Sequence, residues 1–194
     1  MKRTANIKRK TSETEIYLDF NLDGSGVCEI DTPVPFFNHV LSSFTRHGKF
    51  DLKIKATGDI EVDTHHLIED IGICLGRAVN KCLENKAGIE RFGFAIIPMD
   101  DALIILSIDI GGRSYLRYSV DILNENIGNM QTILIEDFFR AFTENANVNL
   151  HITKNAGLNS HHIIEGIFKS FGFALMKASR LSGSDIIPST KGTI

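Results

Sequence analysis

The sequence has little that would support a disulfide scaffold or a nucleic-acid interface. Its three cysteines, Cys28, Cys74 and Cys82, are odd in number and form no Cys-x-x-Cys pair, so we expect reduced, buried thiols. Lys and Arg number 21 against 24 Asp and Glu, and they form no basic stripe. This balance argues against nucleic acid as a partner.

Long apolar runs are also missing. The apolar segment 102–110 is far too short to cross a bilayer, and no apolar stretch that would make a secretory signal follows the basic start Met1-Lys2-Arg3. No linker rich in Pro or Ser divides the 194 residues. We therefore expect a cytoplasmic protein without a membrane segment, folded as one compact domain.

Two matching segments, residues 65–69 (HHLIE) and 161–165 (HHIIE), hold four of the seven histidines. The match continues at the same offset through further pairs, including Gly76 and Gly172, Ala78 and Ala174, and Lys81 and Lys177. Two unrelated short helices would rarely agree at so many positions. We interpret the pattern as an internal duplication.

Upstream blocks of the two copies also match. Residues 13–22 and 101–110 alternate as strands and end at Asp23-Gly24 and Gly111-Gly112, where we expect turns, the first of them a hairpin. Helices are predicted at 38–45 and 136–143, short strands at 50–56 and 148–153, and histidine-led helices at 64–83 and 160–179. The prediction is an α+β fold of two halves, residues 1–90 and 91–182, followed by a tail, residues 183–194. Each half has the order strand-strand-helix-strand-helix, and a pseudo-twofold relates the two halves.

Helical geometry limits what a doubled histidine can do. Side chains three or four residues apart share a face of a helix, whereas neighbours diverge by about 100°. Glu69 can therefore join only one of His65 and His66 around a metal ion, and Glu165 only one of His161 and His162. Two copies predict two similar sites, whose imidazole and carboxylate donors suit Mn, Fe, Zn, Ni or Co. Helix capping or surface hydrogen bonding by the histidines is the alternative, but neither requires duplication.

Several motifs resemble the imidazoleglycerol-phosphate dehydratase family. They are residues 10–14 (KTSET), 63–70 (DTHHLIED), 91–93 (RFG), 98–103 (PMDDAL), 159–165 (NSHHIIE) and 188–192 (PSTKG). They occur in the family's order and span essentially the whole chain. The resemblance implies a manganese lyase that dehydrates imidazole glycerol phosphate to imidazole acetol phosphate in histidine biosynthesis, through a metal-stabilised imidazolate-type intermediate.

The resemblance also implies two Mn²⁺ ions per active site and a set of eight ligands. Seven carry the expected residue types: His39, His65, His66, Glu69, His161, His162 and Glu165. The eighth position is Asp137, where the family often has histidine; it matches His39 in the repeat, and a carboxylate can still bind manganese. His151 is the rival for this role, although it is also compatible with a hydrogen-bonded core histidine.

For the substrate, the resemblance implies Glu13 as the proton-transfer residue, with Glu165 adding proton transfer to its ligand role. Asp101, the repeat mate of Glu13, is interpreted as structural. His47 is a candidate contact to the substrate hydroxyls. The implied phosphate-binding residues are Arg91, Arg113, Lys169, Ser189, Thr190 and Lys191. A phosphate bound by them would order the polar tail, whereas a chain terminus without such contacts is usually poorly ordered.

The resemblance further implies a homo-oligomer, a 24-subunit shell built from trimers, with active sites where subunits meet. Two other functions fit the histidines and stay open at this point. One is a non-catalytic metal-binding assembly protein, and the other is a di-metal phosphoesterase with closely spaced ions.

Overall fold

The computed structural model describes residues 2–194; Met1, at which the first half was predicted to begin, lies outside them. The first half comprises β1 (Thr4–Lys10), β2 (Thr14–Asn21), β3 (Cys28–Asp31), α1 (Pro35–Gly48), β4 (Asp51–Gly58) and α2 (His65–Leu83). The second comprises β5 (Phe92–Met99), β6 (Ala102–Asp109), β7 (Tyr115–Ser119), α3 (Leu134–Ala146), β10 (Asn149–Ala156) and α4 (Ser160–Ser179), with a short hairpin of β8 (Asn126–Ile127) and β9 (Met130–Gln131) before α3. The α+β class and the two similar halves are confirmed.

Both halves build a four-stranded mixed sheet with the same strand order, β1-β2-β4-β3 and β5-β6-β10-β7. The last pair of each sheet is parallel and the other pairs are antiparallel. Each of these sheets therefore has one strand more than predicted, because β1 and β5 were missed, and the short β8–β9 hairpin of the second half was not predicted either. β1 is an edge strand in which only Ala5 is fully buried, so its sequence lacks the apolar alternation that reveals a strand.

The hairpin predicted at Asp23-Gly24 is wrong. β2 pairs with β1 and β4, and β3 lies on the far side of β4. Gly24 serves close packing instead, because a Cβ at this position would lie 2.2 Å from the backbone nitrogen of Asp51, where β4 begins. The turn at Gly111-Gly112 likewise leads from β6 to β7, with β10 between them. Turn residues indicate that the chain changes direction, but not which strand becomes the neighbour.

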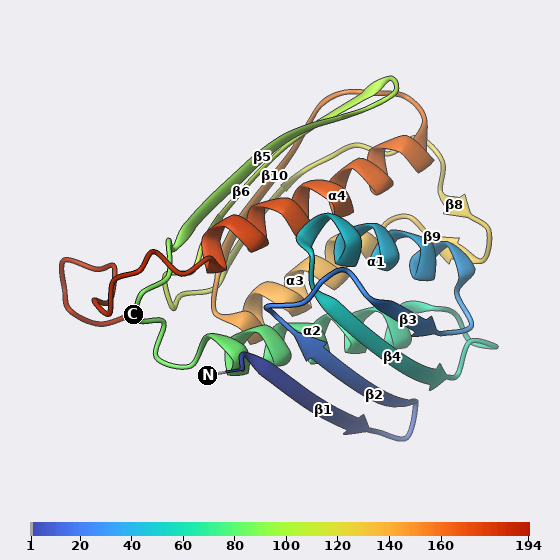
Figure 1. The fold of residues 1–194 in the computed structure, drawn as a ribbon. Helices are drawn as coiled ribbons and strands as arrows, with labels where there is room; N and C mark the ends of the chain where they lie inside the picture. The colour runs from blue at the N-terminus through green and yellow to red at the C-terminus, as the bar shows by residue number, and fades with distance from the viewer. Residues whose placement is uncertain (1) are drawn as a thin grey trace.

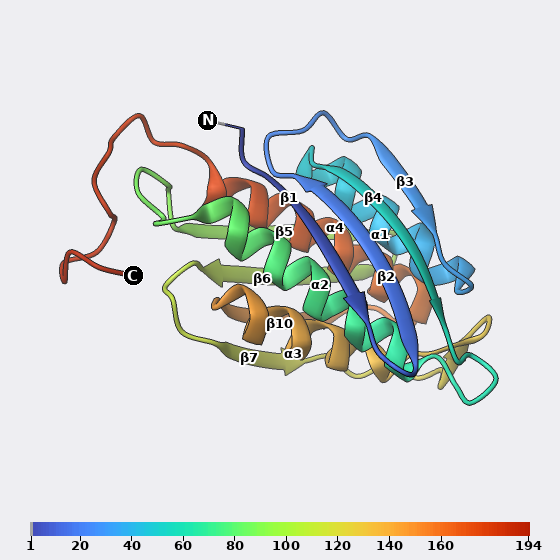
Figure 2. The same cartoon turned by 90° about the horizontal axis from the view of Figure 1, so that it is seen from below.

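The four helices lie between the two sheets (Figure 1). α1 packs on α4 and α2 packs on α3, so each pair joins the two halves, and α2 runs beside α3 in Figure 2. Glycines allow this approach: a Cβ at Gly76 would lie 2.6 Å from the carbonyl oxygen of Phe142, and one at Gly172 would lie 2.3 Å from that of Phe44. Since each core is completed by the other half, neither half buries its helices alone.

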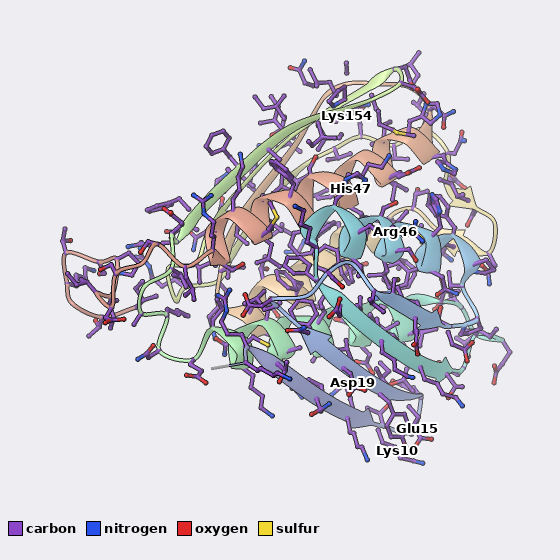
Figure 3. The ribbon with its side chains drawn as sticks, viewed as in Figure 1. Lys10, Glu15, Asp19, Arg46, His47 and Lys154 are labelled. Atoms are coloured by element: carbon purple, nitrogen blue, oxygen red, sulfur yellow. The ribbon has the colours of Figure 1, made fainter. Side chains whose placement is uncertain are left out.

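The outer face of the first sheet is polar. Along β2, Ile16, Leu18 and Phe20 are buried, while the alternate positions point outward, including Glu15 and Asp19 (Figure 3). None of the described helices has the length and apolar character needed to span a membrane.

The three cysteines are free thiols, and they differ in burial. Cys74 and Cys82 are buried, and burial raises the pKa of each thiol to about 11. Cys28 is only half-buried, which corrects the expectation that all three are buried.

Candidate active site

Helices α1 and α4 bring together three metal-ligating side chains from different halves. His39 lies in the second turn of α1, and His161 and Glu165 lie one turn apart at the start of α4. The Nε2 atoms of His39 and His161 are each 3.2 Å from Glu165 Oε2. Within residues 2–194, this is the one group of at least three His, Cys, Asp or Glu donors close enough to share a metal ion.

Glu165 is the buried member of this group, with 8% of its surface exposed. Lys169 Nζ lies 2.9 Å from its other carboxylate oxygen, and the Ser43 hydroxyl donates to that oxygen at 3.4 Å. Burial opposes ionisation, but hydrogen bonds from Lys169 and His39 outweigh it and hold the pKa of Glu165 at about 2. The carboxyl group is therefore ionised at neutral pH, as a metal ligand must be.

The start of α4 fixes the direction of its histidines. The Asn159 side chain accepts hydrogen bonds from the backbone N–H groups of His161 at 2.9 Å and His162 at 3.4 Å, which caps the helix. Both imidazoles therefore belong to the first turn. Two imidazoles and one carboxylate, with no thiolate, suit a borderline or hard divalent ion such as Mn²⁺.

The second histidine of each pair points away from the first. His66 Nδ1 lies 3.1 Å from an oxygen of Asp59, and its Nε2 lies 3.8 Å from Glu13. His162 Nδ1 lies 2.6 Å from Asp101. Neighbouring imidazoles thus face different groups, as the helical geometry predicted. In each pair, a carboxylate at Nδ1 leaves Nε2 as the atom that could ligate a metal, and the Nε2 atom of His162 lies 3.3 Å from an oxygen of Asp100.

Sequence reasoning missed Asp59 and treated Asp101 only as the repeat mate of Glu13. The hydrogen bond to Asp59 raises the pKa of His66. Asp101 accepts the backbone N–H groups of Leu158 and Asn159, and these bonds together with His162 hold its pKa far below the usual range. Asp59 directly follows β4 and Asp101 directly precedes β6, so no fixed spacing along the chain links either residue to its histidine.

The first histidine pair has a looser arrangement. His65 Nε2 lies 3.9 Å from Glu69, one turn further along α2. The glycine contacts described above set α3 on α2 in the register that α1 has on α4, so Asp137 occupies on α3 the position of His39 on α1. His65, Glu69 and Asp137 do not form a compact donor group within the described chain.

Two further histidines were considered from sequence. His151 is exposed on β10, with its ring 5.5 Å from that of Tyr115. The interpretation of His151 as a hydrogen-bonded core histidine is therefore wrong. His47 lies near the end of α1 beside α4 (Figure 3). Partial desolvation, followed by the charge of Lys169, lowers the pKa of His47.

The tail docks near Arg91. The Arg91 Nε donates to Asp109 at 2.7 Å, and its Nη1 donates to the Pro188 carbonyl at 2.8 Å. The Gly88 N–H donates to the Ile186 carbonyl at 3.0 Å. The remaining residues predicted to bind phosphate at this end of the molecule are Ser189, which is half-buried, and Arg113, Thr190 and Lys191, which are exposed.

Comparisons with known proteins agree on one family. The family model described as Imidazoleglycerol-phosphate dehydratase matches residues 32–175. Two relatives with this name come from Thermodesulfovibrio yellowstonii, 51% identical over 192 residues, and Caldanaerobacter subterraneus subsp. tengcongensis, 50% identical over 193 residues; each match covers 99% of this chain and 100% of the relative. The crystal structure of the Staphylococcus aureus enzyme of that name aligns with a TM-score of 0.84 at 36% identity, covering 92% of this chain and 99% of its own. The chain belongs to the imidazoleglycerol-phosphate dehydratase family.

Membership of this family makes the chain a hydro-lyase of histidine biosynthesis, which removes water from imidazole glycerol phosphate. The resemblance drawn from the motifs is thereby confirmed. Its substrate has an imidazole ring at one end and a phosphate at the other, so an imidazoleglycerol-phosphate dehydratase needs both a ring site and an anion site.

In one chain, the histidine end of α4 and Arg91 lie too far apart to contact the same substrate molecule. The Arg91 N–H donates to the carbonyl of Ala178, near the end of α4, whereas His161 lies at its start. At 1.5 Å rise per residue, residues 161 and 178 are about 25 Å apart, far more than a ring joined to a phosphorylated three-carbon chain. The tail leaves α4 at its C-terminal end (Figure 1), whereas the histidines belong to its N-terminal end. Lys169 is the exception, because it pairs with Glu165 at the histidine end.

Proposed function

We propose that this dehydratase works with Mn²⁺, two ions in each active site, held by the two histidine pairs and their glutamates. The main support is the group formed by His39, His161 and Glu165, whose donors already converge. The proposed ligands are His39, His65, His66, Glu69, Asp137, His161, His162 and Glu165. When bound, the ions would act as Lewis acids on the two ring nitrogens and stabilise the negative charge that develops in the imidazole ring.

Glu13 is proposed to transfer the proton. It lies in the turn between β1 and β2, about half-exposed, with its carboxylate 3.8 Å from His66 Nε2. A substrate ring held next to His66 would place its three-carbon chain within reach of this carboxylate. Glu165 is primarily a ligand in this scheme. Because its pKa is about 2, its carboxylate can accept a proton at neutral pH but holds none to donate.

The active site is proposed to lie where subunits meet. One subunit supplies Arg91, Arg113 and the tail residues Ser189, Thr190 and Lys191 to the phosphate, and another supplies the histidines to the ring. The separation of the two sets along α4 supports this arrangement. His47 and Lys169, at the histidine end, would contact the substrate from the other side. A 24-subunit shell built from trimers would provide such shared sites repeatedly.

Mixed assemblies test the shared site. His161→Ala and Lys191→Ala are each purified, mixed after metal removal, and reassembled with Mn²⁺. Each variant alone should turn over imidazole glycerol phosphate poorly, whereas the mixture should recover activity because some sites receive both intact residues. The wild-type protein treated in the same way is the control. No recovery in assemblies shown to contain both variants would contradict a site shared between subunits.

The product distinguishes this function from the alternatives. With Mn²⁺, the wild-type protein should convert imidazole glycerol phosphate to imidazole acetol phosphate. Release of inorganic phosphate instead would favour the phosphoesterase. Tight metal binding without turnover would favour the non-catalytic assembly protein.

A further inference from the structure

Lys86 is a buried lysine without an ion-pair partner. Only 6% of its surface is exposed, and no carboxylate among residues 2–194 lies within ion-pair distance of its ammonium group. The ammonium also donates no side-chain hydrogen bond within this part of the chain. Lysine is almost never fully buried unless it is paired, because its charge loses its hydration. Burial lowers the pKa of Lys86, and only the charge of Asp109 opposes this shift.

The lysine points toward the loop that carries Arg113. Lys86 lies in the turn after α2, in the left-handed region with φ 59°. A Cβ at Gly112 would lie 3.6 Å from Lys86 Nζ, and Gly112, with φ 75°, immediately precedes Arg113. The ammonium therefore reaches the same turn as one of the proposed phosphate ligands.

The charges around this turn do not balance. Asp109 is the nearby side-chain carboxylate, and its two oxygens already accept from Arg91, at 2.7 and 3.2 Å. The carboxylate of Ile194 also lies at this turn, because its carbon would be 2.9 Å from a Cβ at Gly112. Lys86 and Arg113 add two further positive charges, so an excess of positive charge remains. A phosphate monoester carries a charge of about −1.5 to −2 at neutral pH and would neutralise this excess.

We propose that Lys86 is a further phosphate-binding residue of the substrate site and favours phosphorylated over unphosphorylated substrates. The proposal rests on the proposed role of Arg91 and Arg113 in binding the same phosphate. Lys86 differs from these arginines in its burial. An ion pair formed at a buried position is screened less by water and salt than one formed at the surface.

The test compares Lys86→Met with Lys86→Arg and Lys53→Met in the Mn²⁺-loaded assembly. Methionine keeps the length of the side chain and removes the charge, and arginine keeps the charge. Lys53 pairs with Glu29 on the exposed face of the first sheet, with Nζ 2.6 Å from the carboxylate, so Lys53→Met controls for the same loss of net charge far from the site. The measurements are the melting temperature with and without inorganic phosphate, the inhibition constant for inorganic phosphate, and kcat and KM.

For Lys86→Met we expect a melting temperature without phosphate that equals or exceeds that of the wild type, because an unpaired buried charge is gone. The rise in melting temperature with phosphate should be lost. KM and the phosphate inhibition constant should each increase about ten- to a hundredfold, as expected for a lost hydrogen bond to a charged group, with kcat changing far less. Lys86→Arg should retain the response to phosphate, and Lys53→Met should behave as the wild type.

An unchanged phosphate response and KM in Lys86→Met would overturn the proposal. A lower melting temperature with a normal phosphate response would also overturn it, because Lys86 would then have a structural role only. The phosphate response is measured without turnover, so it is independent of the proposed function. The wild-type protein could fail to dehydrate the substrate while the phosphate response is still lost in Lys86→Met. This result would support the anion site and contradict the proposed function.

Discussion

Replacement of Asp59 by asparagine tests how the outer histidine of the first pair is prepared for metal binding. Asp59 faces His66 Nδ1 with both carboxylate oxygens, at 3.2 and 3.1 Å. Asparagine keeps the size of the side chain but removes the negative charge that orients the ring and makes Nε2 more basic. We expect Asp59→Asn to weaken Mn²⁺ binding at the site that uses His66 and to leave the other site unaffected.

The magnitude follows from the exposure of the pair. Loss of a partner that orients a metal-bound histidine costs about 10- to 100-fold in metal affinity. The side chains of His66 and Asp59 are 36% and 23% exposed, so water screens their interaction. We therefore expect a loss of Mn²⁺ affinity at the lower limit of this range, about tenfold, which corresponds to roughly 1.4 kcal/mol of binding free energy. The assay is titration of the metal-free protein with Mn²⁺ in competition with a chelator of known affinity.

Asp63→Asn is the matched control. Asp63 lies in the same loop and accepts the backbone N–H of His65 at 2.7 Å, but no hydrogen bond joins it to an imidazole among the described residues. An equal loss of Mn²⁺ affinity in both variants would show that local charge, rather than the Asp59–His66 contact, sets the affinity. Unchanged affinity in Asp59→Asn would refute the reasoning directly.

The same contact predicts a dependence on pH. The hydrogen bond to Asp59 raises the pKa of His66 above its usual 6.5. In the metal-free protein, this bond therefore stabilises the fold below about pH 6.5, and the contribution is lost as the pH rises through the raised pKa. Wild-type His66 also holds its proton more tightly than the variant, and only neutral imidazole binds metal. The advantage of the wild type in Mn²⁺ affinity should thus shrink as the pH falls from 8 toward 6.

Three further predictions concern different parts of the molecule. Glu13→Gln should lower kcat by about 100-fold or more with a normal Mn²⁺ content by metal analysis, and unchanged turnover would remove Glu13 from proton transfer. Gly72→Ala places a Cβ 2.6 Å from the Phe138 carbonyl oxygen and should destabilise the protein by about 1–3 kcal/mol in denaturant titration; an unchanged midpoint would contradict the tight contact of α2 with α3. In the metal-free protein, Glu165 has a pKa of about 2 against 4.5 when unfolded, so its stabilising contribution is complete above about pH 4.5 and is lost as the pH falls toward 2. Glu165→Gln should flatten the pH dependence of the melting temperature in this range.

The duplication and the histidine-led helices could be predicted because their signals are local. The apolar spacing of residues 64–83 and 160–179 is that of helices packed on one side, and α2 and α4 match these ranges to within one residue at either end. The different directions of His161 and His162 follow from the same periodicity. Motifs spread over the chain then identified the family, and no single motif would have sufficed.

The missed features depend on contacts between segments distant in sequence. β1 is an edge strand that buries one side chain fully, so its alternation is weak, and the crossover after Asp23-Gly24 is decided by β4, which the chain reaches only later. The contact of Asp59 with His66 was missed for the same reason. Asp59 becomes a partner of His66 because the end of β4 and the start of α2 meet in space, and nothing in its local sequence distinguishes it from the other acidic residues.

Pairing of helices across the two halves explains why the chain needs both copies of its repeat. His39 belongs to the first half, but the pair it joins, His161 and Glu165, belongs to the second. A single half would place each histidine pair on a helix without the facing helix that brings in the third donor. A similar argument applies to the association of chains. Because α4 separates the histidine end from Arg91 by far more than the length of the substrate, the proposed site would require a second chain, as the donor group required a second half.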